Sequence, residues 1–182
     1  LSYRMMLTNV LNFGPARITQ DTVFLCAMPT FHTGGLNCYS NPVFHAGGTV
    51  LIMRDFDPAS ALALLEDGDA GITHFFGTPA HYLFVGQQPG FESATFPALK
   101  IAGLGGAPAT DTLVSQWVDK GVPLQPAYGM TEIGPAIVIT ELDRVRDKIG
   151  SAGQPALHVD FKIAGPDGHE LDAGEVGEIW VK

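Results

Sequence analysis

The sequence predicts an α/β fold: a mostly parallel sheet with helices on both faces, followed by the start of a small antiparallel β subdomain. Up to about residue 127, short apolar runs alternate with segments of helical spacing, which is typical of a covered parallel sheet. From residue 159 apolar residues recur at every second position on both sides of a Gly-Pro-Asp-Gly turn. This pattern is typical of a β-hairpin with one solvent-exposed face. We therefore expect an α/β subdomain over 1–147 and an antiparallel part over 148–182, with a linker over 148–155.

The individual elements follow from apolar spacing, helix caps and chain breakers. Gly14-Pro15 ends the first helix, Asp57 precedes a Pro that can open a helix, and Thr110 can cap another. The expected strands are 22–27, 49–53, 72–76, 99–104 and 123–127, and the expected helices are 2–12, 36–44, a segment from 58, 79–85 and a segment after Thr110.

The composition excludes several classes of protein. Ten Lys and Arg against nineteen Asp and Glu give a net charge of −9, which argues against a nucleic-acid binder, since that needs a basic surface. No apolar run is long enough to span a membrane. Two cysteines, Cys26 and Cys38, are too few for a disulfide framework, and they lack the spacing of metal ligands. We therefore expect a reduced, cytoplasmic protein. Because the first residue is Leu1 and the last segment is strand-like, we expect a piece of a longer chain.

The common nucleotide and hydrolase fingerprints are missing. The chain has no G-x-x-x-x-G-K-[ST], no G-x-S-x-G and no H-E-x-x-H. Gly103 and Gly105 begin a dinucleotide pattern, but Pro108 stands where its third glycine belongs. These absences exclude an ordinary P-loop enzyme, dehydrogenase, esterase or zinc protease.

Two motifs follow neighbouring expected strands and carry most of the functional signal. One is Tyr128-Gly129-Met130-Thr131-Glu132 and the other is Gly105-Gly106-Ala107-Pro108. A Thr hydroxyl can donate to a phosphate oxygen and a Glu carboxylate can hold Mg²⁺. Ligands bind at the carboxyl edge of such sheets, so both motifs could wall one pocket with Tyr128 against an adenine ring. The alternatives are a ligand-free tight turn and a solvated Thr-Glu pair.

Other candidate residues allow two interpretations. His32 is either a loop histidine bonded to backbone or a ring that gates an acyl pocket, and the other histidines are expected to be structural or exposed. Gly48, Phe75, Phe76 and Met130 suggest either an apolar pocket or plain core packing. Residues 150–155 are most simply a flexible connector, or a segment that seats the β part near a nucleotide.

Taken together, the motifs resemble the adenylate-forming superfamily, which includes acyl-CoA synthetases, luciferases and adenylation domains of peptide synthetases. The resemblance covers nearly the whole chain, in the family's order. It is carried by Pro29-Thr30-Phe31-His32-Thr33-Gly34-Gly35, Gly105-Gly106-Ala107-Pro108, Tyr128-Gly129-Met130-Thr131-Glu132, Gly150-Ser151-Ala152-Gly153-Gln154-Pro155 and Gly174-Glu175-Val176-Gly177-Glu178-Ile179.

The resemblance implies a reaction in which a carboxylic acid, ATP and Mg²⁺ give an acyl-adenylate, and CoA then displaces AMP. It implies that Thr131 contacts phosphate and Glu132 holds Mg²⁺ as the catalytic residues. The remaining implied contacts are Gly106, Ala107, Pro108, Tyr128 and Gly129 with the nucleotide, and His32, Gly103, Gly105 and Met130 with the acyl group.

The leading hypothesis is the central part of an acid–CoA ligase, with the segment 29–35 suggesting a fatty acid. The resemblance places a phosphate loop before Leu1 and a ribose-binding Asp, an Arg and a catalytic Lys after Lys182. Isolated, the chain is therefore expected to be inactive. The alternatives are an amino-acid-activating adenylation domain and a non-catalytic module that binds a nucleotide or a partner.

Overall fold

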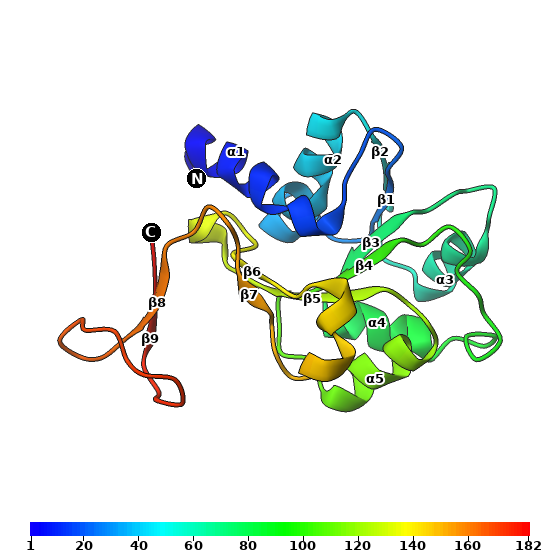
Figure 1. Cartoon of the computed structure of the whole chain (residues 1–182). Helices are drawn as coiled ribbons and strands as arrows, with labels where there is room; N and C mark the ends of the chain where they lie inside the picture. The colour runs from blue at the N-terminus through cyan, green and yellow to red at the C-terminus, as the bar shows by residue number, and fades with distance from the viewer.

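Residues 1–182 form a seven-stranded sheet and a separate two-stranded sheet in a computed structural model (Figure 1). The strand order of the large sheet is β2-β1-β3-β4-β5-β6-β7. Strands β2 to β5 pair in parallel, whereas β6 and β7 add to the edge in antiparallel orientation. The strands are β1 (Val23–Cys26), β2 (Thr49–Ile52), β3 (His74–Gly77), β4 (Ile101–Leu104), β5 (Leu124–Tyr128), β6 (Val138–Ile139), β7 (Gln154–Pro155), β8 (Phe161–Ala164) and β9 (Glu178–Val181).

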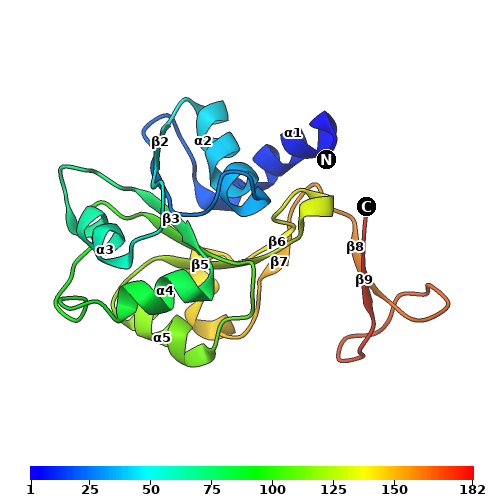
Figure 2. The same ribbon diagram turned by 180° about the vertical axis from the view of Figure 1, so that it is seen from behind.

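Helices cover both faces of the large sheet, which confirms the predicted fold class. Helices α1 and α2 lie on one side, and α4 and α5 lie on the other in both views (Figures 1 and 2). No helix is both long and apolar enough to cross a bilayer. The helices are α1 (Tyr3–Asn12), α2 (Asn41–Ala46), α3 (Pro58–Glu66), α4 (Pro79–Gly86) and α5 (Asp111–Asp119), with a π-helix, η2 (Gly34–Ser40), and short 3₁₀ turns η1 (Gly14–Ala16), η3 (Thr131–Ile133), η4 (Leu142–Arg144) and η5 (Arg146–Lys148).

Two cores result from the alternation of side chains along the buried strands. Leu25 and Phe75 belong to the core that includes residues of α3, α4 and α5, whereas their neighbours Phe24 and Phe76 belong to the core beside η2. Successive residues of a strand point to opposite faces, so strands that are buried on both faces need continuous apolar runs. This explains why the strands were visible in the sequence.

The α5 cap provides a test of local helix stability. The Thr110 hydroxyl accepts a hydrogen bond from the Leu113 N–H at 3.3 Å, as the sequence predicted. We expect Thr110→Ala to lower the free energy of unfolding by about 1 kcal/mol, measured by urea denaturation. Thr112→Ala is the control, because Thr112 is exposed inside α5 and Ala favours a helix. Equal effects of both changes would contradict a capping role for Thr110.

Helix α1 buries polar side chains rather than an apolar face. Its buried residues are Asn9 and Asn12, while Met5 and Met6 are only half-buried. The Asn9 amide donates to the Asn37 carbonyl at 2.7 Å, and the Asn12 side chain accepts from the His158 N–H at 3.2 Å. Buried amides with long-range partners satisfy backbone groups, and apolar spacing does not reveal such partners.

Several boundaries also differ from the sequence expectation. The helix expected over 36–44 begins at Gly34 as a π-helix and continues as α2 to Ala46. Strand β6 was missed because its two residues are too few for a periodic signal. The expected connector is not free, since Gln154–Pro155 pairs with β6 and the large sheet extends past residue 147. The division into subdomains at 147/148 remains a proposal. The hairpin formed by β8 and β9 projects away from the large sheet (Figure 1).

A buried histidine provides a test of pH-dependent stability. His74 is 1% exposed and its ring bonds the Ala16 carbonyl and the Thr73 hydroxyl. Desolvation lowers its pKa below the usual 6.5, against the opposing effect of the Ala16 bond. Below about pH 6.5 the unfolded chain therefore binds a proton that the folded chain does not, so stability falls as pH falls.

We expect the free energy of unfolding to decrease from about pH 7 to about pH 5, and less steeply in His74→Gln. Urea denaturation across that range measures the slope. His45→Gln is the control, because His45 is exposed at the end of α2. An unchanged slope in His74→Gln would show that this ring does not carry the dependence. His81, whose pKa burial also lowers, contributes in the same direction and is left intact.

Candidate functional site

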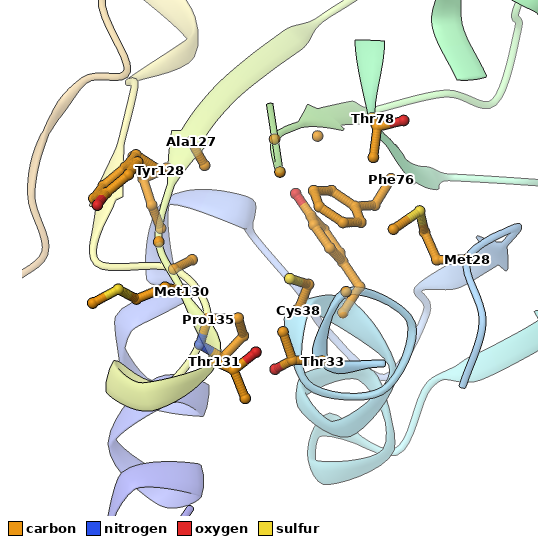
Figure 3. A pocket seen from close by; sticks show the side chains of 18 of the residues that line it. Met28, Thr33, Cys38, Phe76, Thr78, Ala127, Tyr128, Met130, Thr131 and Pro135 are labelled. Atoms are coloured by element: carbon orange, nitrogen blue, oxygen red, sulfur yellow. The ribbon is translucent and has the colours of Figure 1, made fainter. Parts of the chain in front are cut away.

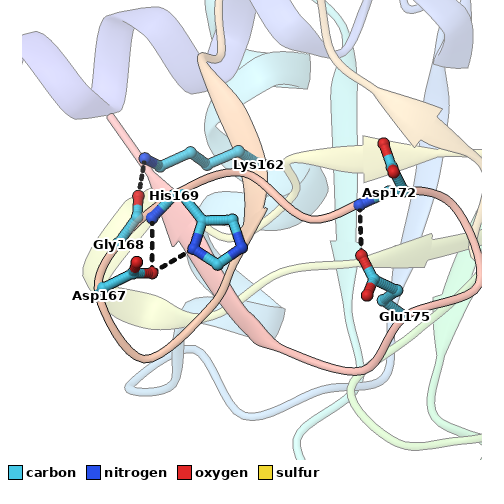
Figure 4. A network of polar contacts seen from close by, with 6 residues as sticks. All are labelled: Lys162, Asp167, Gly168, His169, Asp172 and Glu175. Carbon is cyan, nitrogen blue, oxygen red and sulfur yellow. Dashed lines mark hydrogen bonds and ion pairs between the residues drawn. The ribbon is translucent and has the colours of Figure 1, made fainter.

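A cavity of about 310 Å³ opens at the carboxyl ends of β3, β4 and β5 (Figure 3). Ligands of open α/β sheets bind at this edge, because the loops that leave parallel strands converge there. The lining residues come from both predicted motifs and from the segment after β1. They are Phe13, Met28, His32, Thr33, Gly34, Cys38, Tyr39, Phe76, Thr78, Gly103, Gly105, Gly106, Gln125, Ala127, Tyr128, Gly129, Met130, Thr131, Glu132, Pro135, Ala136 and Ile139.

A second cavity of about 390 Å³ adjoins the first on the side of α5 and η5. Gly106, Ala127, Tyr128 and Gly129 line both cavities, so these residues form the wall between them. Its other lining residues are Leu104, Ala107, Pro108, Ala109, Val114, Pro126, Val145, Lys148, Ile149, Gly150, Ser151 and Ala152. The two motifs that were expected at one site therefore do meet, because β4 and β5 are neighbours.

Two glycines allow the chain to turn sharply where β4 ends beside the two cavities. Gly106 has a φ of +82°, a conformation that costs a residue with a Cβ atom about 1 kcal/mol or more. A Cβ atom on Gly105 would lie 3.1 Å from the Ala127 carbonyl. The Gly-Gly pair therefore lets the chain turn from β4 while staying close to β5.

Thr131 and Glu132 open the turn η3 and are both exposed at the first cavity. Neither of the two ion pairs in the structure involves Glu132. No cluster of three or more His, Cys, Asp or Glu side chains exists that could form a metal cage. A single free carboxylate nevertheless fits Mg²⁺, which is usually held by one or two carboxylates together with substrate phosphates.

His32 makes the backbone hydrogen bond of the first interpretation and also lies at the first cavity, while its gating role stays a prediction. Its Nδ1 accepts the Gly34 N–H at 3.0 Å, and the residue also lines the first cavity. When the ring is neutral, this bond leaves the hydrogen on Nε2. The ring therefore has a fixed orientation and one free donor.

The inner part of the first cavity is enclosed by buried side chains that sequence reasoning missed. Tyr39 stacks between Phe24 and Phe76, with ring centroids 5.2 and 5.5 Å away, and meets the Phe13 ring edge-on at 5.1 Å. Burial raises the pKa of the Tyr39 hydroxyl far above its usual value and raises the pKa of Cys38 to about 12. Both groups are therefore neutral at physiological pH.

Two sequence suggestions need correction. Phe75 lies in the opposite core and Gly48 lies elsewhere, so of the four suggested apolar pocket residues only Phe76 and Met130 line the cavity. Ala107 and Pro108, which were expected on the nucleotide side, line the second cavity. Gly150, Ser151 and Ala152 line that cavity as well, which a flexible connector would not do.

The missed lining residues include Tyr39, Thr78, Gln125 and Lys148. Gln125 carried a usable signal, because it is a polar residue inside an otherwise apolar strand. Tyr39 gave none, since an aromatic residue in a helical segment is most often core.

Comparisons with known proteins identify the family of this chain. The family model described as AMP-binding enzyme matches residues 1–182. The chain is 36% identical over 164 residues to a feruloyl-CoA synthase from Amycolatopsis sp, covering 90% of the chain and 33% of that protein. It is 32% identical over 165 residues to an indoleacetate–CoA ligase from Aromatoleum aromaticum, covering 91% of the chain and 32% of that protein.

Among solved structures, ATP-bound MatB from Rhodopseudomonas palustris aligns with a TM-score of 0.89 and 30% identity. The alignment covers 100% of this chain and 36% of that one. The chain thus spans about a third of the length of the relatives that it matches. The family match over the whole chain shows that this chain belongs to the AMP-binding enzyme family.

Proposed function

We propose that this chain is the central part of an ATP-dependent acid–CoA ligase, with the acid in the first cavity and the adenine in the second. The observation that carries the proposal is the shared wall of Gly106, Ala127, Tyr128 and Gly129 between two adjoining cavities. An acyl-adenylate consists of an acyl group and an adenosine that are joined through a phosphate, so each of the two parts can occupy one cavity. Two adjoining cavities that share lining residues suit such a ligand.

The proposed reaction has two steps. A carboxylate oxygen attacks the α-phosphorus of ATP and pyrophosphate leaves; the CoA thiol then attacks the acyl carbon and AMP leaves. Thr131 donates its hydroxyl to a phosphate oxygen, and Tyr128 packs against the adenine ring. Glu132 would hold Mg²⁺, which supplies charge neutralisation and a template for the phosphates.

The other site residues divide between the two ligand parts. Ala107, Pro108 and the Gly106 backbone contact the adenine in this proposal. His32, Gly103, Gly105 and Met130 border the acyl group, and the His32 Nε2 hydrogen is free to donate to the acyl carboxylate.

The first cavity favours a compact, ring-bearing acid over the fatty acid suggested by segment 29–35. Tyr39 is held by three aromatic rings at the inner end, so extending the cavity would require those rings to move. The names of the similar ligases refer to ferulate and indoleacetate, which are aromatic acids. Glu132 is the only acidic residue that lines the cavity, so a buried ammonium would lack a partner, which argues against an amino acid.

Pyrophosphate release tests the proposal. The full-length protein that contains these residues should release pyrophosphate with ATP, Mg²⁺, CoA and an aromatic acid, and should form the acyl-CoA. No release with any aromatic, aliphatic or amino acid would favour the non-catalytic alternative. Activity with amino acids alone would favour an adenylation domain.

The free thiols of Cys26 and Cys38 accord with the cytoplasmic location that we expect.

A further inference from the structure

A buried polar pair lies at the inner end of the first cavity, where the proposed chemistry has no use for it. Gln125 is 2% exposed and Tyr39 is 3% exposed, and both line the cavity. The Tyr39 hydroxyl donates to Gln125 Oε1 at 3.5 Å, and Gln125 Nε2 donates to the Pro15 carbonyl at 3.2 Å. The first of these bonds is long, so the pair holds itself together only weakly.

The sheet places this pair with little freedom to move. Gln125 pairs in register with Gly103 on the neighbouring strand, and a Cβ atom on Gly103 would lie 2.6 Å from the Tyr39 hydroxyl oxygen. The hydroxyl therefore occupies the space that a side chain at Gly103 would fill. Stacking on Phe24 and Phe76 fixes the plane of the Tyr39 ring, so its oxygen is held at the cavity wall.

Both side chains keep hydrogen-bonding capacity beyond the bonds that they make. The Tyr39 oxygen is an acceptor as well as a donor, and the Gln125 amide has a second N–H and a second lone pair. Glu132 is the only Asp, Glu, Lys or Arg that lines the cavity, and it is exposed whereas this pair is buried. A neutral group that both donates and accepts is the best match, and a hydroxyl is the simplest such group.

We propose that Tyr39 and Gln125 are specificity-determining residues that recognise a hydroxyl group at the end of the acid remote from its carboxylate. This inference rests on the proposed function and narrows its substrate to phenolic acids. A hydroxyl on the bound acid would form hydrogen bonds with the unused donor and acceptor groups of the buried pair. An acid that carries only a hydrogen atom at that position would leave these groups without a partner. Sites built in this way discriminate against the analogue that lacks the hydroxyl.

The test compares phenylpropanoic acid with its para-hydroxy analogue in the full-length protein, as the ratio of their kcat/KM values for pyrophosphate release. We expect the hydroxylated acid to be preferred by about 10-fold or more. Tyr39→Phe removes only the hydroxyl and should reduce that preference to less than about 3-fold. Because the readout is a ratio, a general loss of activity or of folded protein does not imitate the result.

Tyr82→Phe is the matched control. The Tyr82 hydroxyl donates to the Gly103 carbonyl at 2.8 Å, but Tyr82 belongs to the opposite core and does not line the cavity. Its loss should leave the preference unchanged. Equal use of both acids by the wild type, or a preference retained in Tyr39→Phe, would overturn the inference while leaving the proposed function intact. No pyrophosphate release with any acid would overturn the proposed function itself, and this inference with it.

Discussion

Glu132→Gln is expected to lower the rate of acyl-adenylate formation by the full-length protein about 100-fold or more. The carboxylate is exposed at the first cavity and has no cationic partner, so it is free to hold a metal on the phosphates. A metal ion contributes several kcal/mol of charge stabilisation to such a reaction, and each 1.36 kcal/mol is about tenfold in rate. Gln keeps the size of the side chain but removes the charge.

The measurement is pyrophosphate release at increasing Mg²⁺ concentration. If Glu132 holds the metal, the variant should also need more Mg²⁺ to reach half of its own maximal rate. Glu92→Gln is the control, because it removes another exposed carboxylate, one that lines neither major cavity. Wild-type turnover by Glu132→Gln would remove the metal assignment. Thr131 would then be the only residue of the motif with a proposed role at the phosphates.

Gly129→Ala is expected to lower the free energy of unfolding by about 3 kcal/mol, as a severe case of overpacking. Gly129 lies where the loop between β5 and β6 closes on itself, since the Ile137 N–H bonds the Tyr128 carbonyl at 3.0 Å. A Cβ atom there would overlap the Pro135 carbonyl oxygen and lie 2.9 Å from the Ala136 Cα. These are backbone atoms, so no side-chain rotation can relieve the contact.

The same change should reduce pyrophosphate release by the full-length protein about 100-fold, because Tyr128 and Thr131 flank Gly129 and must shift with the loop. Urea denaturation and the release assay measure the two effects. Gly68→Ala is the control: it is a loop glycine whose Cβ atom would meet only the Pro97 ring, at 3.8 Å. A small effect of Gly129→Ala on both measurements would show that the loop opens easily and that its tight closure is not needed.

The fold class and the meeting of the two main motifs could be predicted from the order of the residues. Continuous apolar runs such as Val23–Cys26 can only be buried on both faces, and a parallel sheet brings the ends of its strands to one edge. The Thr110 cap and the turns at glycine were also predictable, because they depend on residues within a few positions of one another. Local chemistry and the period of the strands were sufficient for these features.

The residues that enclose the two cavities could not be predicted, because they come together only when distant segments pack. Tyr39 and Gln125 are 86 positions apart, and their contact depends on η2 packing over Gly103, which no local pattern encodes. The buried Asn9 and Asn12 and the two-residue strands β6 and β7 likewise depend on partners distant in the chain. Periodicity reports which face of an element is buried, but the identity of the neighbour across that face is fixed only when the whole chain packs.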